Sequence, residues 1–388
     1  MCDALRRQRP SGYRKARPAE GAKSLSYCWL TVVVAIAFSL LQPVSVSAQE
    51  QSRLWQVFLE RDVDDLGFDR LIFVDALTGE ANPVEVFGER YTPAGNGILY
   101  YDSASDRVML ATANGRVRQH PFIQPGGGTR RVDWLVSPDG SMLAWTLTNG
   151  DSASALTTIT TVANIDGTNP RQVLVDGPRT GIRALPVAFS SDNTVLYMDF
   201  QPDGIGALTP FRQYAGLFAV DLESGEQGYL PDEPGCFCGA AIEAGLFLRL
   251  SVTEDLSGFD LLVYNLAGQV EQAIPAVALP NYTQAGDILA APDGTRAVYA
   301  LAQVRGFGSE NQSVRTVFVL VNLEEMTQAA LTEPITTYVQ PVAWTEDNSA
   351  IIFTSPERDG TWKVNLSTGT LDKVAEATYV GRLLTVGD

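Results

Sequence analysis

The sequence predicts an all-β fold, a single β-propeller of about seven four-stranded blades over residues 49–388. Three observations lead to this prediction. A turn motif repeats at the spacing of a propeller blade, a hairpin motif alternates with it, and each end of the region carries one further strand. Residues 49–388 show no stretch with the 3.6-residue period of an amphipathic helix, so we expect no second domain.

The first repeat is an apolar strand, a tight turn and a second apolar strand. Its clearest copy has the turn Ser137–Gly140, with sequence Ser-Pro-Asp-Gly, between two apolar segments. Proline and glycine set the geometry of such a turn, and the aspartate side chain caps its backbone amides. The shared turn position recurs at Ala94, Asp139, Asp192, Ala244, Asp293 and Asp347. The spacings of 45, 53, 52, 49 and 54 residues are typical of one four-stranded blade each.

The second repeat is a strand that ends in a tight, usually Gly-containing turn and leads into another strand. Alternating β-branched and aromatic residues before such a turn indicate a β-hairpin. Seven copies are present: Leu71–Gly79, Val108–Val117, Thr157–Val173, Leu217–Gly225, Leu261–Gly268, Val317–Leu323 and Trp362–Gly369. Seven hairpins against six turns leave one blade incomplete. We expect the C-terminal strand Tyr379–Val386 to complete the blade of the N-terminal strand Leu54–Leu59, which would remove the open sheet edges.

Both motifs resemble those of TolB-like and WD40-like propeller repeat proteins. The resemblance covers essentially all of residues 50–388 and implies the fold. It implies no single function, because this repeat occurs in periplasmic transport partners, peptidase gating domains and many uncharacterised exported proteins. The Trp-Asp ending and Gly-His start of the eukaryotic-type repeat are absent. Function therefore has to be argued from a site and not from the fold.

Residues 1–48 differ from the rest in charge and hydropathy. Seven basic residues precede an apolar run from Leu25 to Leu41, and Val46-Ser-Ala48 resembles a cleavage site before Gln49. These are the parts of a secretory signal. The alternative is an uncleaved anchor, since about 17 apolar residues is the lower limit of a spanning helix. We expect an exported protein (extracellular, periplasmic or in the cell envelope), or a single-pass protein with its propeller outside.

Charge limits the classes of partner. After the leader is removed, 21 basic and 43 acidic residues remain, a net charge near −22. Nucleic acids and anionic membrane surfaces bind basic patches. We therefore expect no nucleic acid partner, and membrane contact only through an uncleaved N-terminal segment.

Cysteine and histidine are too scarce for most catalytic chemistry. Cys236 and Cys238 are the two cysteines after the leader; a disulfide between them would close a strained ring, so free thiols and a local disulfide both stay open. His120 is the single histidine, and the Gly-x-Ser-x-Gly nucleophile motif is absent. A histidine-dependent triad or metal site would have to use His120. The sequence therefore predicts no catalytic residue and favours a protein that is not an enzyme.

One acidic segment is a candidate ion site. Closely spaced carboxylates can supply oxygen ligands to Ca²⁺, and here they are Asp62, Asp64, Asp65 and Asp69. The segment departs from the Asp-x-Asp-x-Asp-Gly pattern and lacks the spaced glutamate of that loop, so a solvated acidic connection is the alternative. No other cofactor is predicted.

Three long insertions are the candidate binding loops, because recognition residues concentrate in long loops on a rigid scaffold. They are residues 201–214, 231–239 and 305–315, and their candidate aromatic anchors are Phe211, Tyr214, Phe237 and Phe307. The sequence thus predicts an exported, non-catalytic scaffold that binds a protein, peptide or glycan. One alternative is a carboxylate- or metal-dependent hydrolase or lyase using the central channel. A cluster of basic residues and acids outside the turns at the channel mouth would favour this alternative. Another is a membrane-tethered extracytoplasmic sensor.

Overall fold

The computed structural model divides the chain into residues 1–49 and 50–388. It describes residues 52–63, 67–151, 154–204, 211–230, 239–266, 269–306, 309–356 and 358–385. The predictions for the leader and for Asp64, Asp65, Cys236, Phe237, Cys238 and Phe307 lie outside these ranges. Within these ranges, no helix has the length and hydrophobicity needed to cross a membrane.

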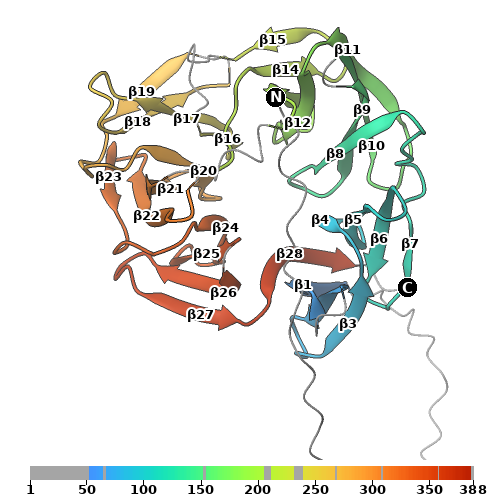
Figure 1. Cartoon of the computed structure of the whole chain (residues 1–388), viewed down its shortest axis with the longest axis horizontal. Helices are drawn as coiled ribbons and strands as arrows, with labels where there is room; N and C mark the ends of the chain where they lie inside the picture. Colours follow the sequence, from blue (N-terminus) through green and yellow to red (C-terminus); the bar gives the residue numbers. More distant parts are fainter. Residues whose placement is uncertain are drawn as a thin grey trace, which may run out of the picture. The chain divides into compact units, whose positions relative to one another are not determined.

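The described residues form seven four-stranded antiparallel sheets, which follow one another around a ring (Figure 1). This confirms the predicted seven-bladed propeller. Blade 1 combines β28 (Thr378–Thr385) with β1 (Arg53–Glu60), β2 (Asp69–Asp75) and β3 (Ala81–Val86). The other blades run from inner to outer strand in chain order. Blade 2 is β4 (Glu89–Ala94), β5 (Gly97–Asp102), β6 (Arg107–Thr112) and β7 (Val117–Gln119); blade 3 is β8 (Thr129–Val136), β9 (Met142–Asp151), β10 (Ala155–Asn164) and β11 (Arg171–Arg179).

The second half of the ring repeats this pattern. Blade 4 is β12 (Ile182–Phe189), β13 (Val195–Pro202), β14 (Leu217–Asp221) and β15 (Gln227–Tyr229); blade 5 is β16 (Ala240–Glu243), β17 (Leu246–Val252), β18 (Phe259–Tyr264) and β19 (Val270–Ile274). Blade 6 is β20 (Gln284–Ala290), β21 (Arg296–Arg305), β22 (Ser313–Asn322) and β23 (Thr327–Ala330); blade 7 is β24 (Gln340–Trp344), β25 (Ala350–Ser355), β26 (Arg358–Asn365) and β27 (Leu371–Ala375).

The two ends of the propeller chain close the ring in blade 1. β28 pairs antiparallel with β1, as the sequence predicts. The Trp55 indole donates a hydrogen bond to Thr385 Oγ1 (3.1 Å), and the rings of Phe58 and Tyr379 pack edge to face at 5.6 Å. The closure pairs strands that would otherwise present free edges.

The repeated aspartates cap their turns and also join neighbouring blades. In the turn between β8 and β9, Asp139 Oδ1 accepts hydrogen bonds from the Ser137 hydroxyl (2.6 Å) and the Ser141 amide (3.0 Å). Its Oδ2 accepts one from Asn193 Nδ2 in blade 4 (2.9 Å). Asp293 accepts the same kind of bond from Asn348 (3.0 Å), which joins blade 6 to blade 7. The repeated aspartates are therefore structural.

The innermost strands, which line the centre of the ring in Figure 1, contain irregularities at two charged residues. The register of β4 shifts between Glu89 and Thr92, and that of β20 between Gly286 and Leu289. Within these shifts Arg90 and Asp287 have φ angles of 59° and 52°. Non-glycine residues rarely adopt this left-handed conformation, and such strain is concentrated at functional sites. The positions of Arg90 and Asp287 on inner strands therefore make the central channel the first place to search for a functional site.

Candidate functional site: an arginine-lined cavity in the central channel

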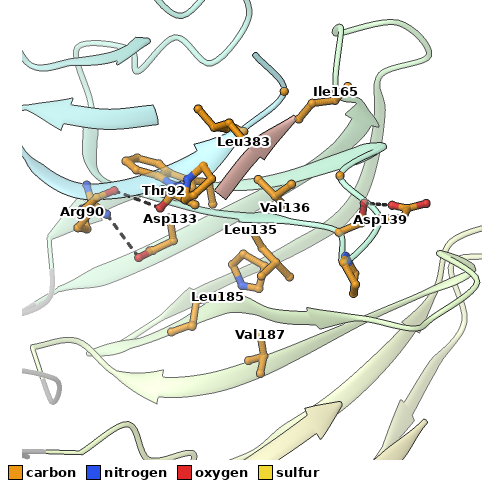
Figure 2. Close-up of a pocket in the computed structure, with 18 of the residues that line it drawn as sticks. Arg90, Thr92, Asp133, Leu135, Val136, Asp139, Ile165, Leu185, Val187 and Leu383 are labelled. Atoms are coloured by element: carbon orange, nitrogen blue, oxygen red, sulfur yellow. Dashed lines mark hydrogen bonds and ion pairs between the residues drawn. The ribbon is translucent and has the colours of Figure 1, made fainter. Parts of the chain in front are cut away.

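A cavity of about 1370 Å³ lies against the inner strands β28, β4, β8 and β12 of blades 1 to 4. Figure 2 shows Arg90 beside Asp133 at one end and the aliphatic side chains of Leu135 and Leu185 further along. Five arginines and two aspartates are the charged residues among its described lining: Arg90, Arg131, Asp133, Asp139, Arg183, Arg212 and Arg382. The lining is thus basic, although the chain as a whole has a net charge of −17.

Three of these arginines converge on one carboxylate, and we call Arg90, Arg131, Arg183 and Asp133 the arginine cluster. Asp133 is 3.0 Å from Arg131 Nε and 3.7 Å from Arg90 Nη1, and it accepts a hydrogen bond from Arg183 Nη1. Asp203 lies at the edge of the cluster, 3.6 Å from Arg183 Nε. Arg90 also lies 3.5 Å from Glu89, but Asp133 is the one acid of the cluster among the described residues that line the cavity.

Protein contacts hold two of these arginines in place. Arg90 donates to the Val132 carbonyl and lies over the ring of Trp134, 4.8 Å from its centroid. The Arg183 side chain is 5% exposed. Burial lowers the pKa of both Arg90 and Arg183, and the Asp133 charge opposes this effect. Within the described part of the chain, the Nε of each has no hydrogen-bond partner.

Strand periodicity aligns the charged end with an aliphatic wall. Side chains two residues apart lie on the same face of a strand, and β8 carries Asp133 and Leu135 in this relation. β12 carries Arg183 and Leu185 in the same way. Both leucines line the cavity and are only half-buried. Together with Leu384, which is 63% exposed, they give the cavity an apolar section beside its basic one.

A loop of blade 4 reaches blades 6 and 7, and we call its residues 211–216 the bridging loop. Phe211 is 2% exposed and packs edge to face on Tyr338 at 5.8 Å. The Arg212 amide donates to Asp287 Oδ1 (2.9 Å). Gly286 is required here, since a Cβ at that position would lie 2.7 Å from Phe211 Cβ. Arg212 and Tyr214 of the loop also line the cavity.

The two predicted anchors that the structure describes, Phe211 and Tyr214, are therefore covered by the protein itself. Tyr214 is 5% exposed and belongs to the core between blades 4 and 5. Their predicted role in contacting a partner stays a prediction.

Three carboxylates outside the turns lie in blades 4 to 6, and two of them, Glu243 and Asp287, interact with Arg212. Glu243 on β16 accepts a hydrogen bond from the Ala290 amide of β20 (2.7 Å), and burial raises the pKa of Glu243 to about 7. Burial also raises the pKa of Asp287, against the lowering effect of Arg212. Asp199 accepts from the Gly216 amide (2.7 Å), and burial raises its pKa to about 6. Glu243 and Asp287 lie on the inner strands β16 and β20, whereas Asp199 lies on β13 and is 0% exposed; none of the three is among the described residues that line the cavity.

The candidate Ca²⁺ residues that the structure describes are occupied by protein donors. Asp69 accepts hydrogen bonds from Arg61 (3.0 Å), the Asp62 amide (3.0 Å) and the Tyr91 hydroxyl (2.8 Å). Asp62 Oδ1 accepts one from the Gly67 amide (2.9 Å). In the described ranges no three His, Cys, Asp or Glu side chains group as metal ligands. Because the other two aspartates lie outside these ranges, the Ca²⁺ site stays a prediction.

His120 follows the outermost strand of blade 2 and is not among the described residues lining the cavity. It is 5% exposed, packs edge to face on Phe122 at 4.4 Å, and accepts a hydrogen bond from the Ile123 amide at Nδ1 (3.2 Å). Burial lowers its pKa to about 4. Its contacts are those of a packed, neutral side chain.

Sequence reasoning missed Arg90, Asp133 and Arg183. Each is a charged residue that interrupts the apolar pattern of a strand leading to one of the repeated turns, and Glu89 and Arg131 add further charges to two of these strands. This interruption was a usable signal, because unpaired charge is costly in a core strand. The pattern does not reveal that the three side chains meet, since they come from three blades.

Comparisons with known proteins give information on the fold and none on the function. No protein-family model and no curated protein sequence matches the chain. An oligogalacturonate lyase solved in complex with manganese superposes with a TM-score of 0.51 at 16% identity, over 80% of this chain and 85% of that one. TolB from Acinetobacter baumannii superposes with a TM-score of 0.44 at 10% identity, over 83% and 79%. At such identities the likeness concerns the fold alone. The chain is a seven-bladed β-propeller with structural similarity to TolB and oligogalacturonate lyase propellers.

Proposed function

We propose that this protein is an exported, non-catalytic propeller that binds a ligand in the cavity of its central channel. The observation that carries the proposal is the cavity of about 1370 Å³, in which charged and aliphatic side chains of adjacent inner strands face the same space. Ligand sites are typically concave and largely apolar, with a few polar groups that orient the ligand. The partner is a protein segment, a peptide or a glycan that enters this cavity.

The asymmetry of the cavity supports this assignment. The turn aspartates recur around the ring and have structural contacts. The arginine cluster occurs in blades 2 to 4 and is not part of the repeat. A feature that one part of a repeat protein carries alone is not needed to build the repeat, so it is the better candidate for recognition.

A thermal-shift screen of residues 49–388 against peptides and glycans tests the proposal, since a ligand that binds only the folded state raises the melting temperature. The variant Leu185→Trp places a bulkier side chain on the aliphatic wall and narrows the cavity there without changing its charge. We expect a ligand that stabilises the wild type to lose its effect on this variant. Leu256→Trp, at a position that is 74% exposed and outside the described cavity lining, is the matched control. A ligand that stabilises both variants equally would place binding elsewhere.

One observation favours a second candidate function, a carboxylate-dependent hydrolase or lyase. Glu243 has a pKa of about 7 and lies on an inner strand, and general acid–base catalysis works best with a pKa near the operating pH. Its bond to the Ala290 amide gives it a structural role as well. The test is turnover of polysaccharides and aryl glycosides by the wild type, by Glu243→Gln and by the control Glu271→Gln, which changes an exposed residue outside the described cavity lining. Turnover lost only in Glu243→Gln would support the enzyme, and an inactive wild type would reject it for these substrates.

A further inference from the structure

We infer that the ligand of this cavity is an amphipathic anion, with a negatively charged head group on an apolar body. This inference rests on the proposed binding of a ligand in this cavity and names the chemistry of that ligand, which a peptide carboxylate or a fatty acid would supply. The arginine cluster receives the head group, and the aliphatic wall of Leu135, Leu185 and Leu384 receives the body.

The charge of the lining selects the head group. Arginine guanidinium groups present planar pairs of N–H donors that match carboxylate geometry, and three of them surround Asp133, the one acid of the cluster among the described cavity lining. The Arg131 side chain is 41% exposed, so its guanidinium is accessible from the cavity that it lines. A positive recess in a strongly acidic protein focuses the field and attracts an anion.

Incomplete hydrogen bonding of the Arg90 and Arg183 guanidinium groups points to the same head group. A buried charge is costly unless it is paired and hydrogen-bonded. Arg90 and Arg183 each retain an Nε–H without a hydrogen-bond partner among the described residues. Arg90 Nε lies 3.5 Å from Glu89 Oε1, and Arg183 Nε lies 3.6 Å from Asp203 Oδ1. An anionic oxygen at this end would add charge compensation. Because both Nε atoms are buried, this compensation is electrostatic, and a neutral hydroxyl would not supply it.

The apolar section selects the body. Leu135 and Leu185 follow Asp133 and Arg183 by two residues on the same strand faces, so the apolar wall continues directly from the basic end. These leucines are half-buried, and Leu384 is 63% exposed. Covering exposed aliphatic surface with an apolar ligand removes it from water and favours binding. A compact polyanion such as citrate would leave this surface uncovered.

Two fluorescent probes with the same aromatic body test the inference. 8-Anilinonaphthalene-1-sulfonate carries an anionic group, and N-phenyl-1-naphthylamine lacks it. Each probe is titrated into residues 49–388 of the wild type, of Arg131→Gln and of Arg107→Gln. Arg107→Gln is the control, because it removes one exposed charge outside the described cavity lining. Decanoate and N-acetyl-leucyl-leucine then compete with the anionic probe, and the stronger competitor distinguishes a fatty-acid source from a peptide carboxylate.

We expect the anionic probe to bind the wild type more tightly than the neutral one. Arg131→Gln should weaken the anionic probe by about tenfold or more, because hydrogen bonds to charged groups are the stronger ones, and should leave the neutral probe unchanged. Arg107→Gln should change neither. Arg183→Lys keeps the charge and loses the planar fork, so weakened binding of the anionic probe by this folded variant supports the same conclusion.

Two results would overturn the inference, and they differ in what they mean for the proposed function. Equal binding of both probes, unaffected by Arg131→Gln but abolished by Leu185→Trp, would leave a binding cavity and reject the anionic head group. Absence of cavity binding by either probe, by decanoate and by the peptide would reject the amphipathic ligand; the screen of glycans and peptides would then decide the proposed function separately.

Discussion

Replacing Phe211 by alanine should detach the bridging loop from blades 6 and 7. Phe211 is 2% exposed, packs on the Tyr338 ring, and lies directly against Gly286. A cavity left by a buried Phe→Ala change costs about 3–5 kcal/mol. We expect the upper part of this range if the Arg212 amide also loses its bond to Asp287.

The change in melting temperature follows from the size of the propeller. An unfolding entropy of about 2.1 cal/mol/K per residue over roughly 330 residues is about 0.7 kcal/mol/K. Phe211→Ala should therefore lower the melting temperature by about 4–7 °C. Calorimetry of residues 49–388 measures this shift, and hydrogen exchange should become faster in the bridging loop.

Phe87→Ala is the matched control, because Phe87 is 50% exposed. We expect it to cost less than about 1 kcal/mol, in line with substitutions at exposed sites. If Phe211→Ala destabilised the protein no more than Phe87→Ala, or if exchange in residues 211–216 did not change, the loop would not be anchored by this side chain.

Three further predictions concern titrating and turn residues. Glu243 binds its proton more tightly in the folded state, so its contribution favours folding below pH about 4.5 and is lost as the pH rises through 7. The unfolding free energy of the wild type should therefore fall over this window, and in Glu243→Gln this fall should be smaller by up to about 3 kcal/mol. Equal pH slopes of the two proteins would contradict this. His120 has a pKa of about 4, so the NMR ring signals of this single histidine should stay constant from pH 8 to 5.5; titration near pH 6.5 would show that it is solvated. Asp139→Ala removes the turn cap and the hydrogen bond to Asn193, and it should lower the free energy of unfolding in chemical denaturation by about 1–3 kcal/mol. A double-mutant cycle with Asn193→Ala should show coupling between the two residues. Additive effects would show that this hydrogen bond does not stabilise the contact between blades.

The architecture was predictable because each blade is encoded by contiguous residues. A Ser-Pro-Asp-Gly turn needs only its own four residues and its two flanking strands, so Asp139 and its counterparts are recognisable without tertiary information. The closure of β1 by β28 followed from counting, since seven hairpins required one more inner strand. The sequence did not indicate that the turn aspartates also bind the next blade, because that bond joins residues 54 positions apart.

The burial of Phe211 and Tyr214 could not be predicted from their local sequence. Phe211 and Tyr214 lie in a long insertion, and such loops usually run over the surface. In this structure they are buried, because the loop turns inward and Gly286 of blade 6 leaves room for the Phe211 side chain. Neither the glycine nor the phenylalanine indicates the other in the sequence.

By itself, the sequence determined the all-β class, the number of blades, the position of the turns and the closure, since these depend on short-range periodicity and turn chemistry. The tertiary structure alone decided the site. Arg90, Asp133 and Arg183 come from three blades, and the bulge that places Arg90 at φ 59° changes which side chains face the channel. A shift of one residue moves a strand's side chains to its other face. The charged cavity therefore depends on register and on the packing of blades, which no single segment encodes.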